Sequence, residues 1–173
     1  FKDTVWRKMA VVDDVTDVYK ACEWIEALCD VGIRPFPIID YLQLGADDGS
    51  AGSTEYENVT KASHKLAHIC KEHLMPMLVL SSLRNLNEKE RDQTPQLSWY
   101  RGSGHVGYDA GTAIVLMRDG EPEPIITNGV QRGSRQRVTA HVIKNRVGSI
   151  GNPQTLLFNG ARNLFGSNRL END

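Results

Sequence analysis

The chain has 173 residues, 40% of them hydrophobic and 24% charged, which is typical of one globular domain that buries a core without disulfide bonds. Three cysteines, none in a CxxC pair, are too few for a disulfide framework, and no apolar run reaches the roughly 18 residues of a membrane-spanning helix. No signal peptide is visible, so we expect a reducing, cytoplasmic location. The net charge of −2 argues against a protein that coats nucleic acid through overall basicity.

The charge is distributed unevenly along the chain. Residues 1–60 contain 5 basic and 12 acidic groups, whereas residues 121–173 contain 7 basic and 4 acidic groups. A basic C-terminal part can meet phosphates even in an acidic chain, although basic residues that only solvate loops would give the same count. The first residue is Phe1 instead of Met, so we expect a fragment or a processed product.

The N-terminal part of the chain begins with a helix and a strand. Apolar residues recur at helical spacing over 15–30, which predicts a helix that ends before Gly32. The apolar run 36–44 is interrupted only by Asp40 and Gln43 and predicts a strand buried on both faces, as in a parallel sheet.

A second helix and strand follow a polar loop over 45–54. Thr54 and Glu57 match a capping box, which predicts that a helix begins after Thr54 and runs over 55–73. The apolar run over 75–82 then predicts a second buried strand.

The C-terminal part is predicted to be rich in strands. Residues 83–111 read as a long loop with one short helix, and 112–118 as a third strand. A polar excursion over 119–136 leads to a fourth strand over 137–144, and a hairpin connects it to a fifth over 154–159. This order predicts an α/β domain whose sheet is parallel at first and antiparallel at its C-terminal edge.

Asp40 is the first residue along the chain whose position indicates a functional site. It ends the apolar run, and a carboxylate at the C-terminal end of a buried strand faces the ligand crevice of an α/β sheet. In nucleoside triphosphatases this position holds magnesium, usually through water. An ordinary residue in the turn after a strand would give the same pattern, so both interpretations stay open.

The segment GSGHVG at 102–107 fits the GxGxxG fingerprint of dinucleotide-binding proteins. No clear strand precedes it, and Tyr108–Met117 read as a turn and a strand instead of a helix, so we reject a nicotinamide or flavin site. Glycine-rich backbone beside Arg101 suits close approach to phosphates, with a flexible loop as the alternative.

Lys144 and Arg146 form a second cationic feature at the end of the fourth predicted strand. Residues two apart on an extended stretch project to the same side of it. Such a pair can stabilise the charge that develops on a transferred phosphoryl group. A charged pair that keeps an edge strand soluble is the alternative.

Taken in order, four segments resemble motifs of the C-terminal ATPase domain of DnaB-type replicative helicases. IDYLQL at 39–44 resembles the family's Walker B strand, and LSSL at 80–83 resembles its sensor strand. RGSG at 101–104 is similar to the DNA-binding loop, and KNRVGSIG at 144–151 to the trans-acting basic motif. The resemblance covers about residues 10–165 and depends on the order and spacing of the motifs.

This resemblance implies a RecA-like P-loop NTPase core over 1–173, α/β in class, with a mostly parallel central sheet and antiparallel C-terminal edge strands. Asp40 would hold a water-bridged Mg²⁺, and Ser82 stands at the sensor position. Lys144 and Arg146 would reach the γ-phosphate of ATP bound by the neighbouring subunit.

The resemblance also implies the partners. Arg101 and the backbone around Gly102 and Gly104 would contact phosphates of single-stranded DNA in the channel of a hexameric ring that acts in DNA replication. A primase or a helicase loader is an expected further partner, and a membrane is not.

The sequence departs from the family pattern at three points. Ser82 stands where the family has a glutamine, and Gly102 stands where it has an acid. No GxxxxGK[ST] motif occurs in the chain. In the family the Walker A loop and the catalytic glutamate precede the Walker B strand, so we expect that residues 1–173 alone do not hydrolyse ATP. These departures leave open a non-catalytic RecA-like module that binds DNA or other subunits. A RadA-type recombination ATPase, which shares the KNR and Gly148–Ser149 pattern, is a third interpretation.

Overall fold

A computed structural model describes residues 9–13, 17–46, 52–102 and 104–166. These residues form two compact units. The N-terminal unit contains the described residues up to Glu90 together with Ser98–Asp109, and the C-terminal unit contains Arg91–Leu97 and the described residues from Ala110 onward. Of the loop predicted over 45–54, residues 47–51 lie outside the described residues.

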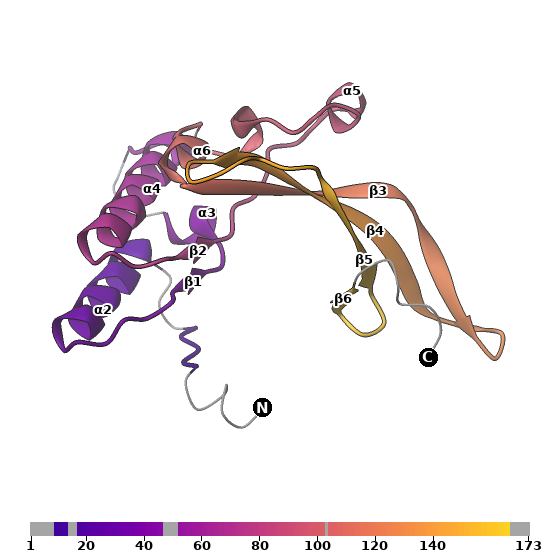
Figure 1. Ribbon diagram of the computed structural model, residues 1–173, viewed down its shortest axis with the longest axis horizontal. Helices are drawn as coiled ribbons and strands as arrows, with labels where there is room; N and C mark the ends of the chain where they lie inside the picture. Colours follow the sequence, from indigo (N-terminus) through magenta and orange to yellow (C-terminus); the bar gives the residue numbers. More distant parts are fainter. Residues whose placement is uncertain (1–8, 14–16, 47–51, 103, 167–173) are drawn as a thin grey trace. The chain divides into compact units, whose positions relative to one another are not determined.

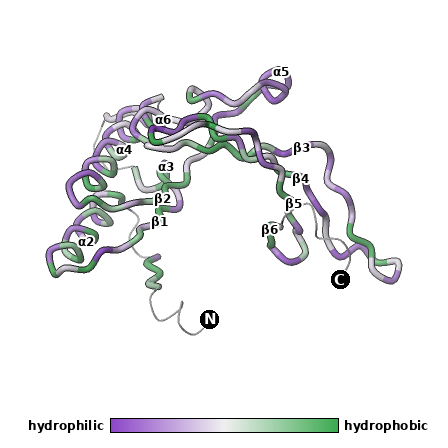
Figure 2. The backbone as a smooth tube through the Cα atoms, in the orientation of Figure 1, coloured by the Kyte–Doolittle hydropathy of each residue, from purple (hydrophilic) through white to green (hydrophobic). Residues whose placement is uncertain are grey.

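Two amphipathic helices dominate the N-terminal unit, and both were predicted. Helix α2 (Val18–Asp30) begins after Asp17, whose side chain accepts a hydrogen bond from the Tyr19 amide at 2.7 Å. Helix α4 (Glu55–Glu72) begins with the predicted capping box of Thr54 and Glu57. Figure 2 shows hydrophobic and hydrophilic residues alternating along both helices, as expected when one face of each is buried.

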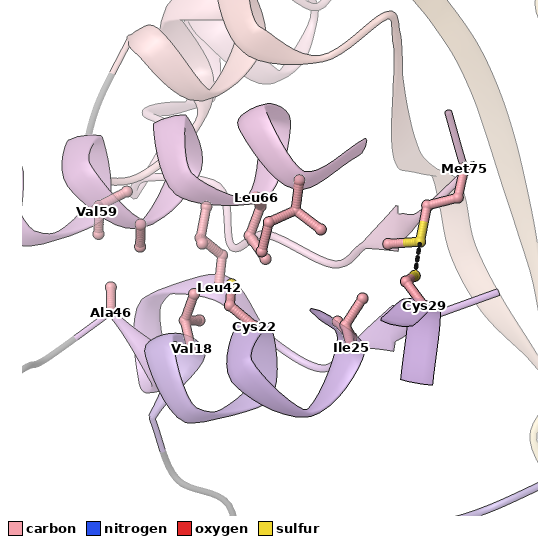
Figure 3. Close-up of a cluster of buried hydrophobic side chains, with 11 residues drawn as sticks. Val18, Cys22, Ile25, Cys29, Leu42, Ala46, Val59, Leu66 and Met75 are labelled. Carbon is pink, nitrogen blue, oxygen red and sulfur yellow. Dashed lines mark hydrogen bonds between the residues drawn. The ribbon is translucent and has the colours of Figure 1, made fainter. Parts of the chain in front are cut away.

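The core of the N-terminal unit lies between these two helices (Figure 3). Eleven buried apolar residues form it: Val18, Cys22, Ile25, Cys29, Leu42, Ala46, Val59, Ala62, Leu66, Ile69 and Met75. Each large aliphatic side chain of this kind contributes about 1.5–3 kcal/mol through burial. Burial raises the pKa of the Cys22 thiol to about 11, so this cysteine remains protonated and acts as a small apolar residue.

The two predicted buried strands are short and covered on one face only. Strand β1 (Ile38–Ile39) pairs in parallel with strand β2 (Leu78–Val79). Ile39 and Val79 pack against the core, whereas Ile38 is 57% exposed and Leu78 49% exposed. The prediction of strands buried on both faces was therefore wrong. One face of each strand packs against the core, and the other face is exposed.

The predicted lengths of these strands were also wrong, because the chain turns at Asp40 and enters the short helix α3 (Leu42–Gly45). The region 83–111 contains three short helices instead of the single one predicted: α5 (Glu88–Arg91), the 3-10 helix η1 (Leu97–Trp99) and α6 (His105–Asp109). The segment around Trp99 is held in place because its carbonyl accepts from the Arg84 amide at 2.8 Å and its side chain is buried.

The C-terminal unit is an antiparallel sheet in the order β3-β4-β5-β6 (Figure 1). The strands are β3 (Thr112–Thr127), β4 (Val130–Asn145), β5 (Gln154–Asn159) and β6 (Leu164–Gly166). The fifth predicted strand and its hairpin connection to the fourth are confirmed, and β6 was not predicted.

The polar excursion predicted over 119–136 was wrong, because these residues are the outer arms of the β3–β4 hairpin. The hairpin turns at Asn128 and Gly129, which both have positive φ, as a two-residue Asn-Gly turn requires. Charged residues such as Glu123 and Arg135 pair across the arms and conceal the apolar alternation of a strand.

The α/β class is confirmed, but the predicted sheet arrangement is only partly correct. Within the described residues the parallel pairing is confined to β1 and β2, and the four C-terminal strands form a separate antiparallel sheet. The expectation of one mostly parallel sheet was therefore wrong. None of the helices in the described residues has the length and hydrophobicity to cross a membrane.

Candidate functional site

Asp40 and Ser82 lie at the carboxyl ends of the two paired parallel strands. Asp40 follows β1 directly and is exposed, and its peptide bond to Tyr41 is cis. The backbone on both sides of Asp40 is fixed, because the Leu80 amide donates to the Ile39 carbonyl and the Leu42 amide donates to the Leu80 carbonyl, each at 2.9 Å. The two strand ends therefore present a carboxylate and a hydroxyl residue at the edge where α/β sheets bind ligands.

Gln43 joins these strand ends to the glycine-rich loop. Its Nε2 donates to the Ser81 hydroxyl at 2.9 Å and to the Arg101 carbonyl at 2.8 Å. Its Oε1 accepts from the Ser82 amide at 3.0 Å, and the Arg101 amide donates to the Ser82 carbonyl at 2.8 Å. Sequence reasoning did not identify Gln43 as a site residue, although a polar residue inside the apolar run 36–44 was an available signal.

Arg101 is exposed and engaged with a carboxylate. Its Nε lies 2.9 Å from Oε1 of Glu55, and its Nη2 lies 3.4 Å from Oε2 of the same residue. The two side chains are 56% and 50% exposed. The pair is consequently weak, and an anion such as phosphate can replace Glu55 at the guanidinium.

The two glycines beside Arg101 have different roles. Gly102 has φ +86°, and a Cβ atom built on it would lie 2.9 Å from Cγ2 of Val59 in α4. A Cβ atom on Gly104 would meet nothing within 4 Å. Gly102 is thus needed for backbone conformation and for close packing, whereas Gly104 is not; Ser103 between them lies outside the described residues.

The far end of the loop is anchored by a carboxylate that sequence reasoning missed. Asp109, at the end of α6, accepts a hydrogen bond from the Ser63 hydroxyl at 2.6 Å. It also pairs with Nδ1 of His64, whose ring lies 5.5 Å from that of His105. Both Ser63 and His64 belong to α4, so the loop after Arg101 is fixed to α4 on both sides.

Lys144 and Arg146 belong to the C-terminal unit. Lys144 is half-buried near the end of β4, and Arg146 is exposed one residue beyond the strand, where its amide donates to the Gly111 carbonyl at 2.9 Å. The expectation that both lie on one extended stretch was wrong, because the chain bends after Asn145. The Asn145 side chain shapes this bend by accepting from the Val147 amide and donating to the Ser149 carbonyl.

The structure therefore links two of the predicted site residues through the side chain of Gln43, which bonds to the Ser82 amide and to the Arg101 carbonyl. Asp40 lies three residues before Gln43 in the chain. Lys144 and Arg146 are grouped in a different unit. The exposed Asp40 carboxylate fits Mg²⁺, which keeps several waters and takes one or two protein carboxylates together with substrate phosphates.

The fold is similar to that of solved helicase ATPase domains of the RecA-like type. Residues 24–167 match the family model of the DnaB-like helicase C terminal domain, and the chain belongs to this family. The resemblance of the sequence to the DnaB-type family is thereby confirmed.

Related proteins are longer than this chain. The chain is 30% identical over 105 residues to the replicative DNA helicase DnaB of Geobacillus stearothermophilus, which covers 61% of this chain and 22% of that protein. A solved structure of a DnaB-like replicative helicase, described with its interactions with primase, superposes with a TM-score of 0.64 at 25% identity and covers 83% of this chain and 33% of the other. A second solved structure, of an ATPase domain, gives a TM-score of 0.68 at 23% identity, over 88% of this chain and 51% of that one.

Proposed function

We propose that this chain is the C-terminal part of an ATP-driven helicase motor that moves on single-stranded DNA during replication. The observation that supports this most directly is the network through Gln43, which joins the acidic strand end to the Arg101 segment in a chain of the DnaB-like family. In this proposal residues 1–173 are one partial RecA-like ATPase domain that completes its nucleotide site with a part of the protein outside this chain.

Each site residue has a role in the proposed motor. Asp40 holds Mg²⁺ through water, and the metal supplies neutralisation of phosphate charge when it is bound. Ser82, three residues after the adjacent strand β2, offers its hydroxyl near the same edge and senses the nucleotide. Lys144 and Arg146 stabilise the developing charge on the γ-phosphate of ATP held by the neighbouring subunit of a hexamer.

DNA binding in this proposal depends on Arg101 and on the backbone of its loop. The guanidinium exchanges its exposed carboxylate partner Glu55 for a DNA phosphate. The backbone at Gly102 and Gly104 comes close to the next phosphates because neither residue has a side chain. A primase is a further proposed partner, by analogy with the solved DnaB-like helicase.

The test is the substitution Arg146→Ala in the complete helicase. We expect ATP hydrolysis to fall by about a thousandfold or more, the range for removal of an arginine finger, while nucleotide binding by the altered subunit persists. The matched control is Arg132→Ala, which removes an exposed arginine near the other end of strand β4. An unchanged hydrolysis rate in Arg146→Ala would contradict the assignment, and a complete helicase that lacks ATP hydrolysis altogether would favour the non-catalytic module.

A further inference from the structure

The side-chain amide of Gln43 bonds to three residues in two different segments of the N-terminal unit. Its partners Ser81 and Ser82 lie 38 and 39 residues away in sequence, and Arg101 lies 58 residues away. The orientation of the amide follows from its partners, since the Ser82 amide can only donate and the Arg101 carbonyl can only accept. Two donor bonds and one acceptor bond therefore converge on one half-buried side chain.

The bonds constrain two different segments of the chain. The bond from Nε2 to the Arg101 carbonyl holds the segment that carries the guanidinium, and the bond from the Ser82 amide to Oε1 holds the end of the sensor strand. Gln43 itself stands three residues after Asp40, in a segment whose Leu42 amide donates to the carbonyl of Leu80, the residue directly after β2. A displacement of the segment 40–43 must either carry Arg101 with it or break the bond to its carbonyl.

We propose that Gln43 is a positioning residue that sets the location of the Arg101 guanidinium relative to Asp40 and Ser82. It touches neither nucleotide nor DNA and acts through the Arg101 backbone. A change at the nucleotide end of the strands thereby reaches the DNA contact. This inference rests on the proposed DNA contact of Arg101.

Two substitutions separate the bonds of the amide. Gln43→Met keeps the length of the side chain and removes all three hydrogen bonds, whereas Gln43→Glu keeps the acceptor for the Ser82 amide and removes both donors. We expect both to weaken binding of a fluorescein-labelled oligothymidylate by about two- to tenfold, the effect of losing the one hydrogen bond to the Arg101 carbonyl that both variants lack. The Ser82 amide stays protected from hydrogen exchange in Gln43→Glu and loses protection in Gln43→Met. Gln93→Glu, at an exposed glutamine, is the control for the added charge.

A double-mutant cycle with Arg101→Ala decides between positioning and general disruption. If Gln43 acts through the guanidinium, Gln43→Met weakens DNA binding in the wild-type background and has no further effect in the Arg101→Ala background. Equal losses in both backgrounds, or no loss in either while Arg101→Ala alone weakens binding, would overturn the inference and leave the proposed function standing.

Two further outcomes separate this inference from the proposed function. If Arg101→Ala binds the oligonucleotide as tightly as wild type, the proposed DNA contact fails and the inference fails with it. In the complete helicase we also expect single-stranded DNA to stimulate ATP hydrolysis less in Gln43→Met than in wild type. Stimulation equal to that of wild type would overturn the link between Gln43 and the nucleotide end.

Discussion

Substitution of Gly102 by alanine tests whether the Arg101 loop requires glycine at this position. The new Cβ atom meets Cγ2 of Val59 at 2.9 Å, a distance that real Cβ atoms essentially never show, and the residue must also adopt φ +86°. A left-handed conformation costs an ordinary residue about 1–2 kcal/mol. Overpacking against a buried side chain costs about 1–3 kcal/mol more. We therefore expect Gly102→Ala to lower the free energy of unfolding of the N-terminal unit by about 2–5 kcal/mol.

Gly104→Ala is the matched control for this substitution. It introduces the same methyl group two residues later, where nothing lies within 4 Å and φ is not positive, so we expect a change below about 1 kcal/mol. Urea denaturation followed by circular dichroism at the helix signal measures both, because α2 and α4 lie in the N-terminal unit. Equal midpoints for the two variants would refute the assigned role of Gly102.

Two further predictions concern acidic residues in the first turn of α4, namely Glu55 and Glu57. The substitution Glu55→Gln removes the charge that competes with DNA for Arg101. It should tighten oligothymidylate binding, measured by fluorescence anisotropy, by about 1.4- to 5-fold, which is the range for loss of an exposed ion pair. Unchanged affinity would mean that Glu55 does not compete with DNA. Hydrogen bonds from Thr54 lower the pKa of Glu57 below its usual 4.5, so its contribution to stability is present above that pH and is lost as the pH falls through the lowered value. Wild type should therefore lose more stability than Glu57→Gln in denaturation series from about pH 5 to about pH 3, and parallel losses would contradict the capping role.

The helices and the acidic strand end could be predicted from sequence because their signals are local. The capping box of Thr54 and Glu57 lies within four residues, and Asp40 ends an apolar run. The role of Gln43 could not be predicted in this way, because its hydrogen-bond partners are 38 to 58 residues distant and are brought near only by tertiary structure. The pattern of apolar residues shows that Gln43 interrupts an apolar run. It does not show which residues form hydrogen bonds with the Gln43 side chain.

The hairpin of the C-terminal unit shows a second limit of pattern reasoning. The Asn128–Gly129 dipeptide is a strong signal for a two-residue hairpin turn, but the flanking segments carry charges and glycines where a strand usually shows apolar alternation. Cross-strand pairs such as Glu123 with Arg135 take the place of apolar contacts on these arms. A prediction that weighs the turn dipeptide above the hydrophobic pattern would have found the full strands.

The position of β3 at the edge of its sheet has a consequence for self-association. Within the described residues β3 pairs with no strand other than β4, so its outer half forms a sheet edge that a strand of another molecule can approach. Its outer half contains Pro122 and Pro124, each preceded by a glutamate, and proline has no amide hydrogen to donate. Repulsion between the glutamates of two such edges adds to this effect. The sequence EPEP therefore protects the hairpin arm against edge-to-edge aggregation while it keeps the arm extended.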